Sequence, residues 1–165
     1  MSCQGTAVAL TASLNESTGG RPWLMVGVDF SDTSGCALLE ARRLARLLNA
    51  RVSVIHVVPD PFRVPWEPDE RATTWLRTYS ASTLDIEPRC GRTWSELARA
   101  AEERGAAAIV VGSHGTSGYQ PVALGSTATG LSLLAPCPVV LVGPRADEAA
   151  QRRRALGYEH AALNP

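Results

Sequence analysis

Glycines and hydroxyl side chains follow a short apolar run in the second half of the sequence, in a pattern typical of an anion-binding loop. The segment Ile109–Gly115 reads Ile-Val-Val-Gly-Ser-His-Gly, and Gly125, Ser126 and Thr127 follow after nine further residues. Glycine lets successive peptide N–H groups converge on a ligand, and a helix N-terminus adds partial positive charge. The alternative is an ordinary turn followed by a helix cap. Strand-like sequence before the loop and after the next helix favours a phosphate cradle.

Segments of strand and helix character alternate along the chain and must position this loop. Strands are predicted over Trp23–Phe30, Arg51–Val58, Thr83–Cys90, Ala107–Val111 and Val139–Val142. Helices are predicted from about Gly35 to Asn49 and over Glu70–Ala81, Thr93–Arg104 and Ser126–Ala135. The strands are nearly all apolar, which is typical of strands buried on both faces. The sequence therefore predicts an α/β fold, a Rossmann-like open five-stranded parallel sheet with four helices on both faces.

The predicted topology brings three distant residues to one edge of the sheet. Ligands of such sheets bind at the carboxyl ends of the strands, where the strand order reverses. This rule gathers Asp29, Val57 and Gly112. The alternative to a ligand role is an ordinary turn carboxylate for Asp29 and an ordinary core valine for Val57.

The spacing of Gly112, Gly115, Gly125 and Ser126 is Gly-x2-Gly-x9-Gly-Ser. It resembles the motif of the nucleotide-binding members of the universal stress protein family. Trp23–Ser34 is similar to the opening strand and acidic turn of that family, and Arg51–Pro59 to its second strand. The resemblance covers residues 22–144.

The resemblance implies a ligand and a set of residues that hold it. The ligand would be ATP, with Mg²⁺ held mainly by the phosphates; adenine and ribose would lie near Asp29 and Val57. The phosphates would follow the glycine loop and the helix start, which gives a predicted binding set of Asp29, Val57, Gly112, His114, Gly115, Gly125, Ser126 and Thr127. The family also implies a homodimer through the edge strand Val139–Val142, and an unpaired apolar edge gives a physical reason for it.

Catalysis receives little support from the residue types. The sequence contains no lysine, which excludes a P-loop lysine and Schiff-base chemistry, and Thr116–Leu124 contains no arginine. His114 lies inside the loop, where a positional role is expected rather than acid–base chemistry. We expect an ATP-binding protein of stress response or signalling without efficient turnover. The alternatives are an adenine-nucleotide hydrolase or adenylyl-transfer enzyme, and a ligand-free regulator that uses the fold for protein contacts.

Length and composition bound the remaining possibilities. The 165 residues, 45% of them apolar, suit one domain, predicted over residues 22–144 between tails at 1–21 and 145–165. The formal net charge is zero, so nucleic acid and anionic membranes are unexpected partners. The four cysteines have no paired spacing, and no apolar run is long enough to cross a membrane. We therefore expect reduced thiols, no metal-binding cysteine site and a cytoplasmic location.

Overall fold

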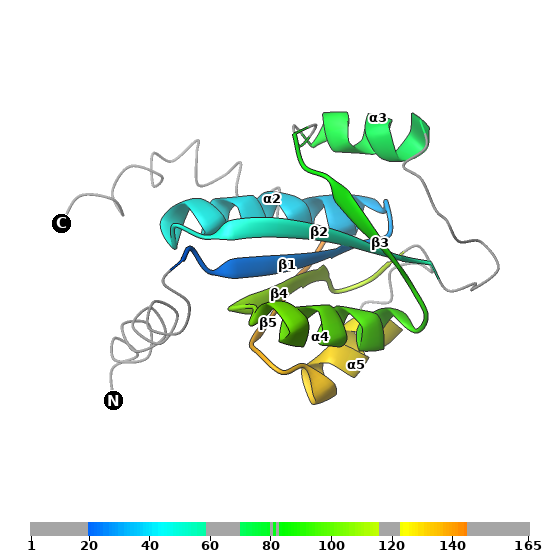
Figure 1. The fold of residues 1–165 in the computed structure, drawn as a ribbon. Helices are drawn as coiled ribbons and strands as arrows, with labels where there is room; N and C mark the ends of the chain where they lie inside the picture. Colours follow the sequence, from blue (N-terminus) through cyan, green and yellow to red (C-terminus); the bar gives the residue numbers. More distant parts are fainter. Residues whose placement is uncertain (1–19, 59–69, 80, 82, 116–122, 145–165) are drawn as a thin grey trace, which may run out of the picture.

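The structure is a computed structural model that describes residues 20–58, 70–79, 81, 83–115 and 123–144. Within these residues, five strands alternate with four helices (Figure 1). In chain order they are β1 (Trp23–Val28), α2 (Asp32–Leu47), β2 (Arg51–Val58), α3 (Glu70–Thr78), β3 (Ile86–Cys90), α4 (Thr93–Arg104), β4 (Ala108–Gly112), α5 (Ser126–Leu134) and β5 (Val139–Val142). The predicted tails lie outside the described residues, apart from Gly20 and Arg21. Segment 59–69, which contains four prolines, also lies outside them.

The five strands form one parallel sheet in the order β3-β2-β1-β4-β5. The chain runs from β1 outward to β2 and β3, then returns to the other side of β1 to form β4 and β5. The strand order therefore reverses between β1 and β4. The last residue of β4 is Gly112, which pairs with Val142 of β5. The predicted parallel α/β fold is confirmed.

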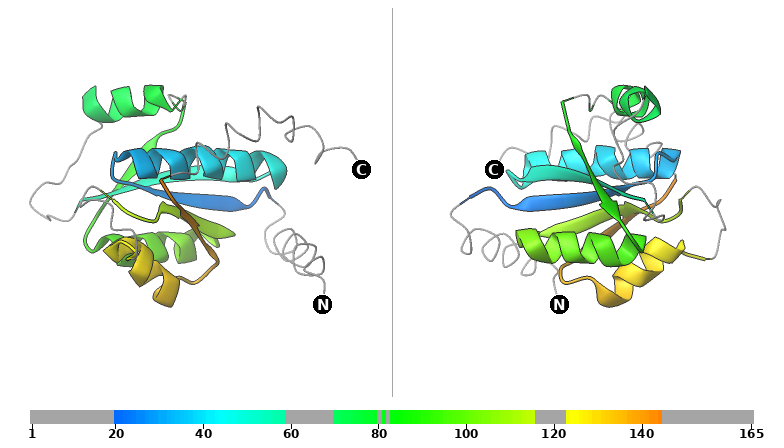
Figure 2. Two further views of the ribbon diagram at one scale, coloured as in Figure 1. Left: turned by 180° about the vertical axis from the view of Figure 1, so that it is seen from behind. Right: turned by 45° about the vertical axis from the view of Figure 1, so that its right-hand side comes forward.

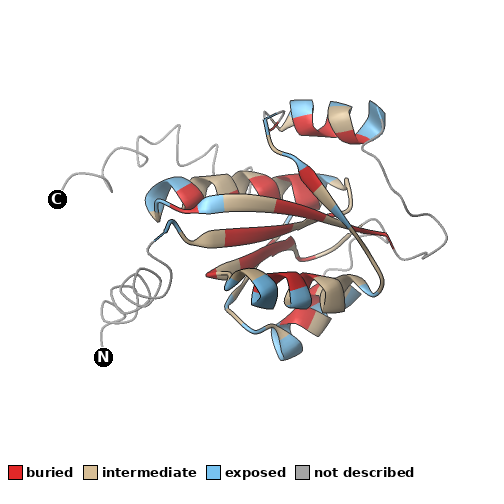
Figure 3. Cartoon of the chain, in the orientation of Figure 1, coloured by how far each residue is buried: buried red, intermediate tan, exposed pale blue. Residues whose placement is uncertain are grey.

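Helices cover both faces of this sheet, α2 and α3 on one face and α4 and α5 on the other (Figures 1 and 2). Side chains alternate between the two faces along each strand, so β1 contributes Val26 to the core under α2 and Met25 to the core under α4. Both side chains are fully buried, and buried residues line the inward faces of the helices (Figure 3). Burial of this apolar surface holds the strand ends in place.

Helix α2 begins earlier than predicted, at Asp32 rather than near Gly35. Ser31 is the N-cap residue, and its hydroxyl accepts a hydrogen bond of 3.2 Å from the Ser34 amide. Gly35 instead lies inside the helix, where a Cβ would overlap the Tyr79 ring. Glycine is needed at position 35 because Tyr79, which follows α3, packs closely on α2 there. Sequence periodicity does not reveal this contact.

Candidate nucleotide-binding site

The glycine loop leaves β4 at the point where the strand order reverses. A Cβ on Gly112 would lie 2.9 Å from the carbonyl oxygen of His114 and 2.9 Å from Cγ2 of Thr33. Such distances are shorter than real Cβ atoms show, and one of the neighbours is backbone. Gly112 is therefore required for the loop to turn tightly against the first turn of α2.

The same loop packs against the start of α5 on its other side. The Gly125 amide donates a hydrogen bond of 2.8 Å to the Ser113 carbonyl. A Cβ on Gly125 would lie 3.3 Å from that carbonyl oxygen and 3.4 Å from Cα of His114. The loop from Gly112 to Gly115 is thus bracketed by the N-terminal ends of two helices, α2 and α5.

The N-terminal ends of α2 and α5 differ in the side chains that cap their first backbone amides. Ser31 and Asp32 supply a capping hydroxyl and a carboxylate to the first turn of α2. The N-cap residue of α5 is Gly125, which has no side chain to cap the helix, and the first turn of α5 carries no acidic residue. Ser126 is exposed and Thr127 is half-buried. The first amides and hydroxyls of α5 are therefore available to bind an anion.

Asp29 follows β1 and contacts the glycine loop that follows the neighbouring strand, β4. Its Oδ1 accepts hydrogen bonds from the Ser31 amide at 3.1 Å and from the Ser31 hydroxyl at 2.6 Å. Its Oδ2 occupies the space that a Cβ of Gly115 would need. Two residues far apart in sequence, Asp29 and Gly115, therefore touch at the carboxyl edge of the sheet.

His114 makes two hydrogen bonds that tie the loop together. Its Nδ1 lies 2.9 Å from the Ser113 hydroxyl, and its Nε2 lies 2.6 Å from the Ala123 carbonyl. A carbonyl only accepts, so Nε2 must carry the proton in that contact. His114 therefore links the residues on both sides of segment 116–122.

Val57 and His56 lie at the end of β2. The Val57 side chain is buried in the core under α4, one residue beyond the last β1–β2 pair, which joins Val28 and His56. Only the Val57 backbone is thus placed to meet a ligand. His56 Nδ1 lies 2.8 Å from the Val28 carbonyl, and its ring centroid is 4.6 Å from that of Phe30.

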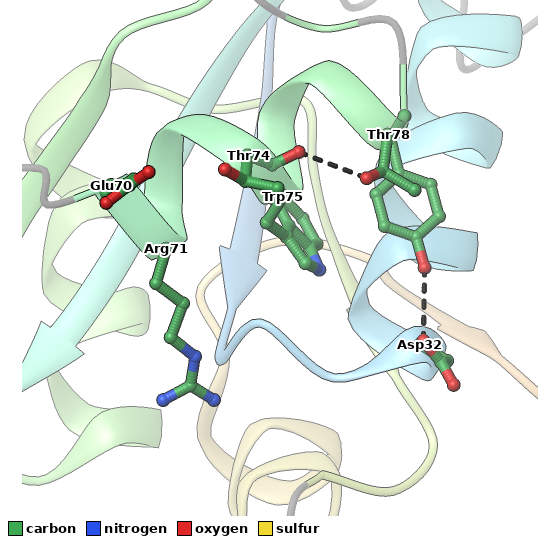
Figure 4. A pocket seen from close by; sticks show the side chains of 7 residues that line it. Asp32, Glu70, Arg71, Thr74, Trp75 and Thr78 are labelled. Carbon is green, nitrogen blue, oxygen red and sulfur yellow. Dashed lines mark hydrogen bonds between the residues drawn. The ribbon is translucent and has the colours of Figure 1, made fainter.

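Sequence reasoning missed an aromatic group and a groove beside it. Phe30 has a φ of 64°, rare for an aromatic residue, and its ring packs at 5.6 Å on Trp75. Between α3 and the start of α2 lies a groove of about 520 Å³, in which the Tyr79 hydroxyl donates to Asp32 at 3.4 Å (Figure 4). The groove is lined by Asp32, Glu70, Arg71, Thr74, Trp75, Thr78 and Tyr79. The only sequence signal was Trp75 and Tyr79 at helical spacing after a proline-rich segment.

Within the described chain, Asp29 places a carboxylate against the loop. Among the described residues, no group of three or more His, Cys, Asp or Glu side chains is placed to hold a metal ion. Arginine ion pairs gather on β3 and α4, where Arg89 bonds Glu87 at 2.9 Å and Glu103 at 2.5 Å. The hydrogen bond from Arg89 holds the pKa of Glu103 below its usual value. Burial raises the pKa of the Cys137 thiol.

None of the described helices has the length and apolar character needed to span a membrane.

The fold and the loop define a parallel α/β protein with a glycine-rich loop at its switch point. Residues 24–143 match the family model described as the universal stress protein family, and the chain belongs to that family. It is 29% identical to the universal stress protein YxiE of Bacillus subtilis (strain 168), over 72% of this chain and 97% of that one.

Two solved structures share the fold. One is a universal stress protein in complex with cAMP, 24% identical with a TM-score of 0.58, a match that covers 75% of this chain and 98% of that one. The other is the universal stress protein from Archaeoglobus fulgidus in complex with dAMP, 23% identical with a TM-score of 0.51, covering 74% and 98%.

Proposed function

We propose that this universal stress protein binds an adenine nucleotide between the glycine loop and the first turn of α5, and acts in stress response or signalling without efficient catalysis. The observation that carries the proposal is the packing of the loop between two helix N-termini at the switch point. Three glycines, Gly112, Gly115 and Gly125, each lie where a Cβ would press on a neighbour. Glycines at these positions keep the backbone of the loop close to its neighbours and leave its amides uncovered by side chains of their own, which suits phosphate binding.

The uncapped first turn of α5 sets the orientation of the proposed ligand. Phosphate lies against Gly115 and the first amides and hydroxyls of α5, from Ser126 and Thr127, because these are the donors without a side-chain cap. Ribose and adenine then extend toward Asp29 and the backbone of Val57, at the ends of β1 and β2. Two proteins of the same fold carry cAMP and dAMP in their solved structures, which supports the adenine nucleotide class.

ATP with Mg²⁺ is included in the proposed ligand class. The described residues offer no cluster of three metal ligands, so Mg²⁺ would be held mainly by the phosphates and would supply charge neutralisation there. Asp29, Ser126 and Thr127 carry the side-chain oxygens of the predicted binding set. Their chemistry suits a hard cation that keeps most of its waters.

Slow or absent turnover follows from the scarcity of cations. Phosphoryl transfer needs positive charge on the transferred group and a residue that orients water. Segment Thr116–Leu124 contains no lysine or arginine, and both ring nitrogens of His114 already contact Ser113 and Ala123. A hydrolase or adenylyl-transfer enzyme on this fold is therefore the weaker alternative. A ligand-free regulator is the other alternative, and the adenine nucleotides bound by two proteins of the same fold favour the binding role over it.

A homodimer through β5 completes the proposal. β5 is an edge strand of the described sheet, and Leu141 on it is 37% exposed. Leu133 and Leu134 at the end of α5 are 78% and 58% exposed. Covering this apolar edge with a second copy removes a liability of unpaired strands. The parent is expected to sediment as a dimer and Leu141→Glu as a monomer. A monomeric parent would contradict the dimer, and a dimeric Leu141→Glu would contradict pairing through β5. We also propose a cytoplasmic location, which the unpaired cysteine spacing supports.

Calorimetric titration with AMP, cAMP and magnesium ATP tests the proposed function. The parent is expected to bind, and Gly125→Val is expected to weaken binding at least tenfold, because the new side chain forces α5 away from the loop. Gly143→Val is the matched control, since a Cβ there has nothing within 4 Å. Circular dichroism confirms that each variant folds. Absence of binding by the parent to all three ligands would refute the proposal.

A further inference from the structure

His114 lies beside the two segments proposed to hold phosphate. It directly precedes Gly115, and its Cα lies 3.4 Å from the position of a Cβ on Gly125, the N-cap residue of α5. The residue is half-buried. Histidine is the side chain that gains or loses a proton near neutral pH, so a positive charge can appear at this point of the loop.

The two hydrogen bonds of the His114 ring are compatible with both of its charge states. Nε2–H donates to the Ala123 carbonyl at 2.6 Å whether the ring is neutral or protonated. Nδ1, which lies 2.9 Å from the Ser113 hydroxyl, accepts from it in the neutral ring and donates to its oxygen in the protonated ring. Protonation therefore changes the charge of the ring and breaks neither contact.

Two carboxylates lie between β1 and α2, next to the loop that carries His114. The carboxylate of Asp29 touches that loop, and Asp32 lies in the first turn of α2. The first turn of α5 and strand β5 carry no titratable side chain. By sequence, segment 116–122 has Tyr119 as its one titratable side chain and no basic residue. A proton on His114 therefore adds a cation that these neighbouring segments do not supply.

We propose that His114 takes up a proton from solvent when a nucleotide binds, and that the imidazolium is the fixed cation beside the phosphate. The inference rests on the proposed function, since it concerns the same loop. The affinity rises as the pH falls, because a protonated ring attracts the phosphate. At a separation of about 7 Å and an effective dielectric constant of about 40, one unit of phosphate charge gains about sevenfold in affinity.

Other roles for the loop residues give different patterns with pH. If His114 served only to tie the loop to Ala123, its substitution would change the affinity to the same extent at every pH. If the proton went to the carboxylate of Asp29 instead, the pH dependence would persist without His114. A proton on His114 makes the pH dependence disappear with the imidazole.

The experiment measures dissociation constants of cAMP by calorimetry from about pH 5.5 to about pH 8. A cyclic phosphate is a diester whose single charge is constant over this range, whereas the terminal phosphates of AMP and ATP titrate there. Adenosine is the ligand control, because it has the same base and ribose without phosphate. A parallel series with ATP compares parent and variant directly, since the titration of the ligand is common to both.

The variant is His114→Gln, which has no titratable group and keeps an N–H that can donate to the Ala123 carbonyl. The chain has two other histidines, so His56→Gln and His160→Gln are the matched controls. Circular dichroism confirms that each variant folds.

The parent is expected to bind cAMP five- to tenfold more tightly at about pH 5.5 than at about pH 8, and adenosine with less than a twofold change. His114→Gln is expected to lose this dependence, and both control variants to keep it. A parent affinity independent of pH, or a dependence that survives in His114→Gln or disappears in a control, would overturn the inference. No binding of any nucleotide by the parent would overturn the proposed function and the inference with it.

Proton uptake by the parent gives a second test that requires no variant to bind. Calorimetry in two buffers of different ionisation enthalpy counts the protons exchanged, and a net uptake is expected when cAMP binds near neutral pH. The ring-proton NMR signals of the three histidines identify the group that takes up the proton. At one fixed pH, His114 is expected to be more protonated in the complex than in the free protein, and the other two to be unchanged. Absence of uptake, release of a proton, or uptake at another histidine would overturn the inference.

Discussion

The central strand β1 leaves no room for a methyl group at Gly27, two residues before Asp29. A Cβ on Gly27 would lie 2.6 Å from Cδ1 of Leu97 and 3.1 Å from Cγ1 of Val111. Leu97 and Val111 are only 1% and 3% exposed, so neither can move aside into solvent. We predict that Gly27→Ala destabilises the fold, although alanine costs less backbone entropy than glycine in a strand.

The expected magnitude is the balance of two effects. Forcing a methyl group into a packed core costs about 1–3 kcal/mol, and the entropy advantage of alanine over glycine returns about 0.5–1 kcal/mol. The net loss is then up to about 2.5 kcal/mol, and about 1 kcal/mol at the centre of both ranges. Leu97→Ala alone is expected to cost about 2–5 kcal/mol, but it empties the space that the new methyl group needs. The double variant should therefore be more stable than the sum of the single losses by about 1–2 kcal/mol.

Urea denaturation of the full chain, followed by tryptophan fluorescence and circular dichroism, measures these free energies of unfolding. Gly143→Ala is the control, because a Cβ at Gly143 has nothing within 4 Å, and it should stay within about 0.5 kcal/mol of the parent. If Gly27→Ala proved as stable as the parent, or the losses in the double variant were simply additive, the packing argument would be refuted.

Three further outcomes are expected. Gly105 caps α4 with a φ of 57°, so Gly105→Ala should cost about 1 kcal/mol in the same assay, and an unchanged stability would contradict a left-handed cap. Burial raises the pKa of the Cys137 thiol, so alkylation of Cys137 by iodoacetamide at neutral pH, mapped by mass spectrometry, should be slower in the folded than in the urea-unfolded protein; equal rates would contradict this. The hydrogen bond from Arg89 lowers the pKa of Glu103, so its stabilising effect is present above the unfolded pKa and lost as the pH falls through the folded one. The stability difference between the parent and Glu103→Gln should therefore shrink on acidification, and a difference that grew would refute the pairing.

Secondary structure was predictable where the sequence supplies both a periodic pattern and a clear stop. Helix α4 has the predicted bounds, Thr93–Arg104, and Gly105 ends it in the left-handed conformation. The start of α2 was predicted wrongly because the run Ser31–Ser34 offers several capping residues in succession. The predicted strand Trp23–Phe30 was too long for a related reason, since nothing marks Phe30 as a residue of positive φ.

The sequence predicted which residues share the carboxyl edge of the sheet, but it did not predict the contacts between them. Strand order places Asp29 and Gly112 on one edge, and the structure has them there. The contact of Asp29 with Gly115 depends on the turn at Phe30, and the contact of Thr33 with Gly112 depends on how α2 packs on the loop. Side-chain orientations of this kind arise from tertiary packing and leave no periodic signal in the sequence. The ligand role of these residues remains a prediction.

The most direct test of a nucleotide in the glycine loop is amide NMR of the ¹⁵N-labelled protein during titration with AMP. The account predicts that the largest shifts occur at the amides of Gly115, Ser126 and Thr127, with small shifts at Thr74 and Thr78 in the groove beside α3. Shifts concentrated at Thr74 and Thr78, with the loop and α5 unaffected, would contradict the central claim and place the ligand in the groove.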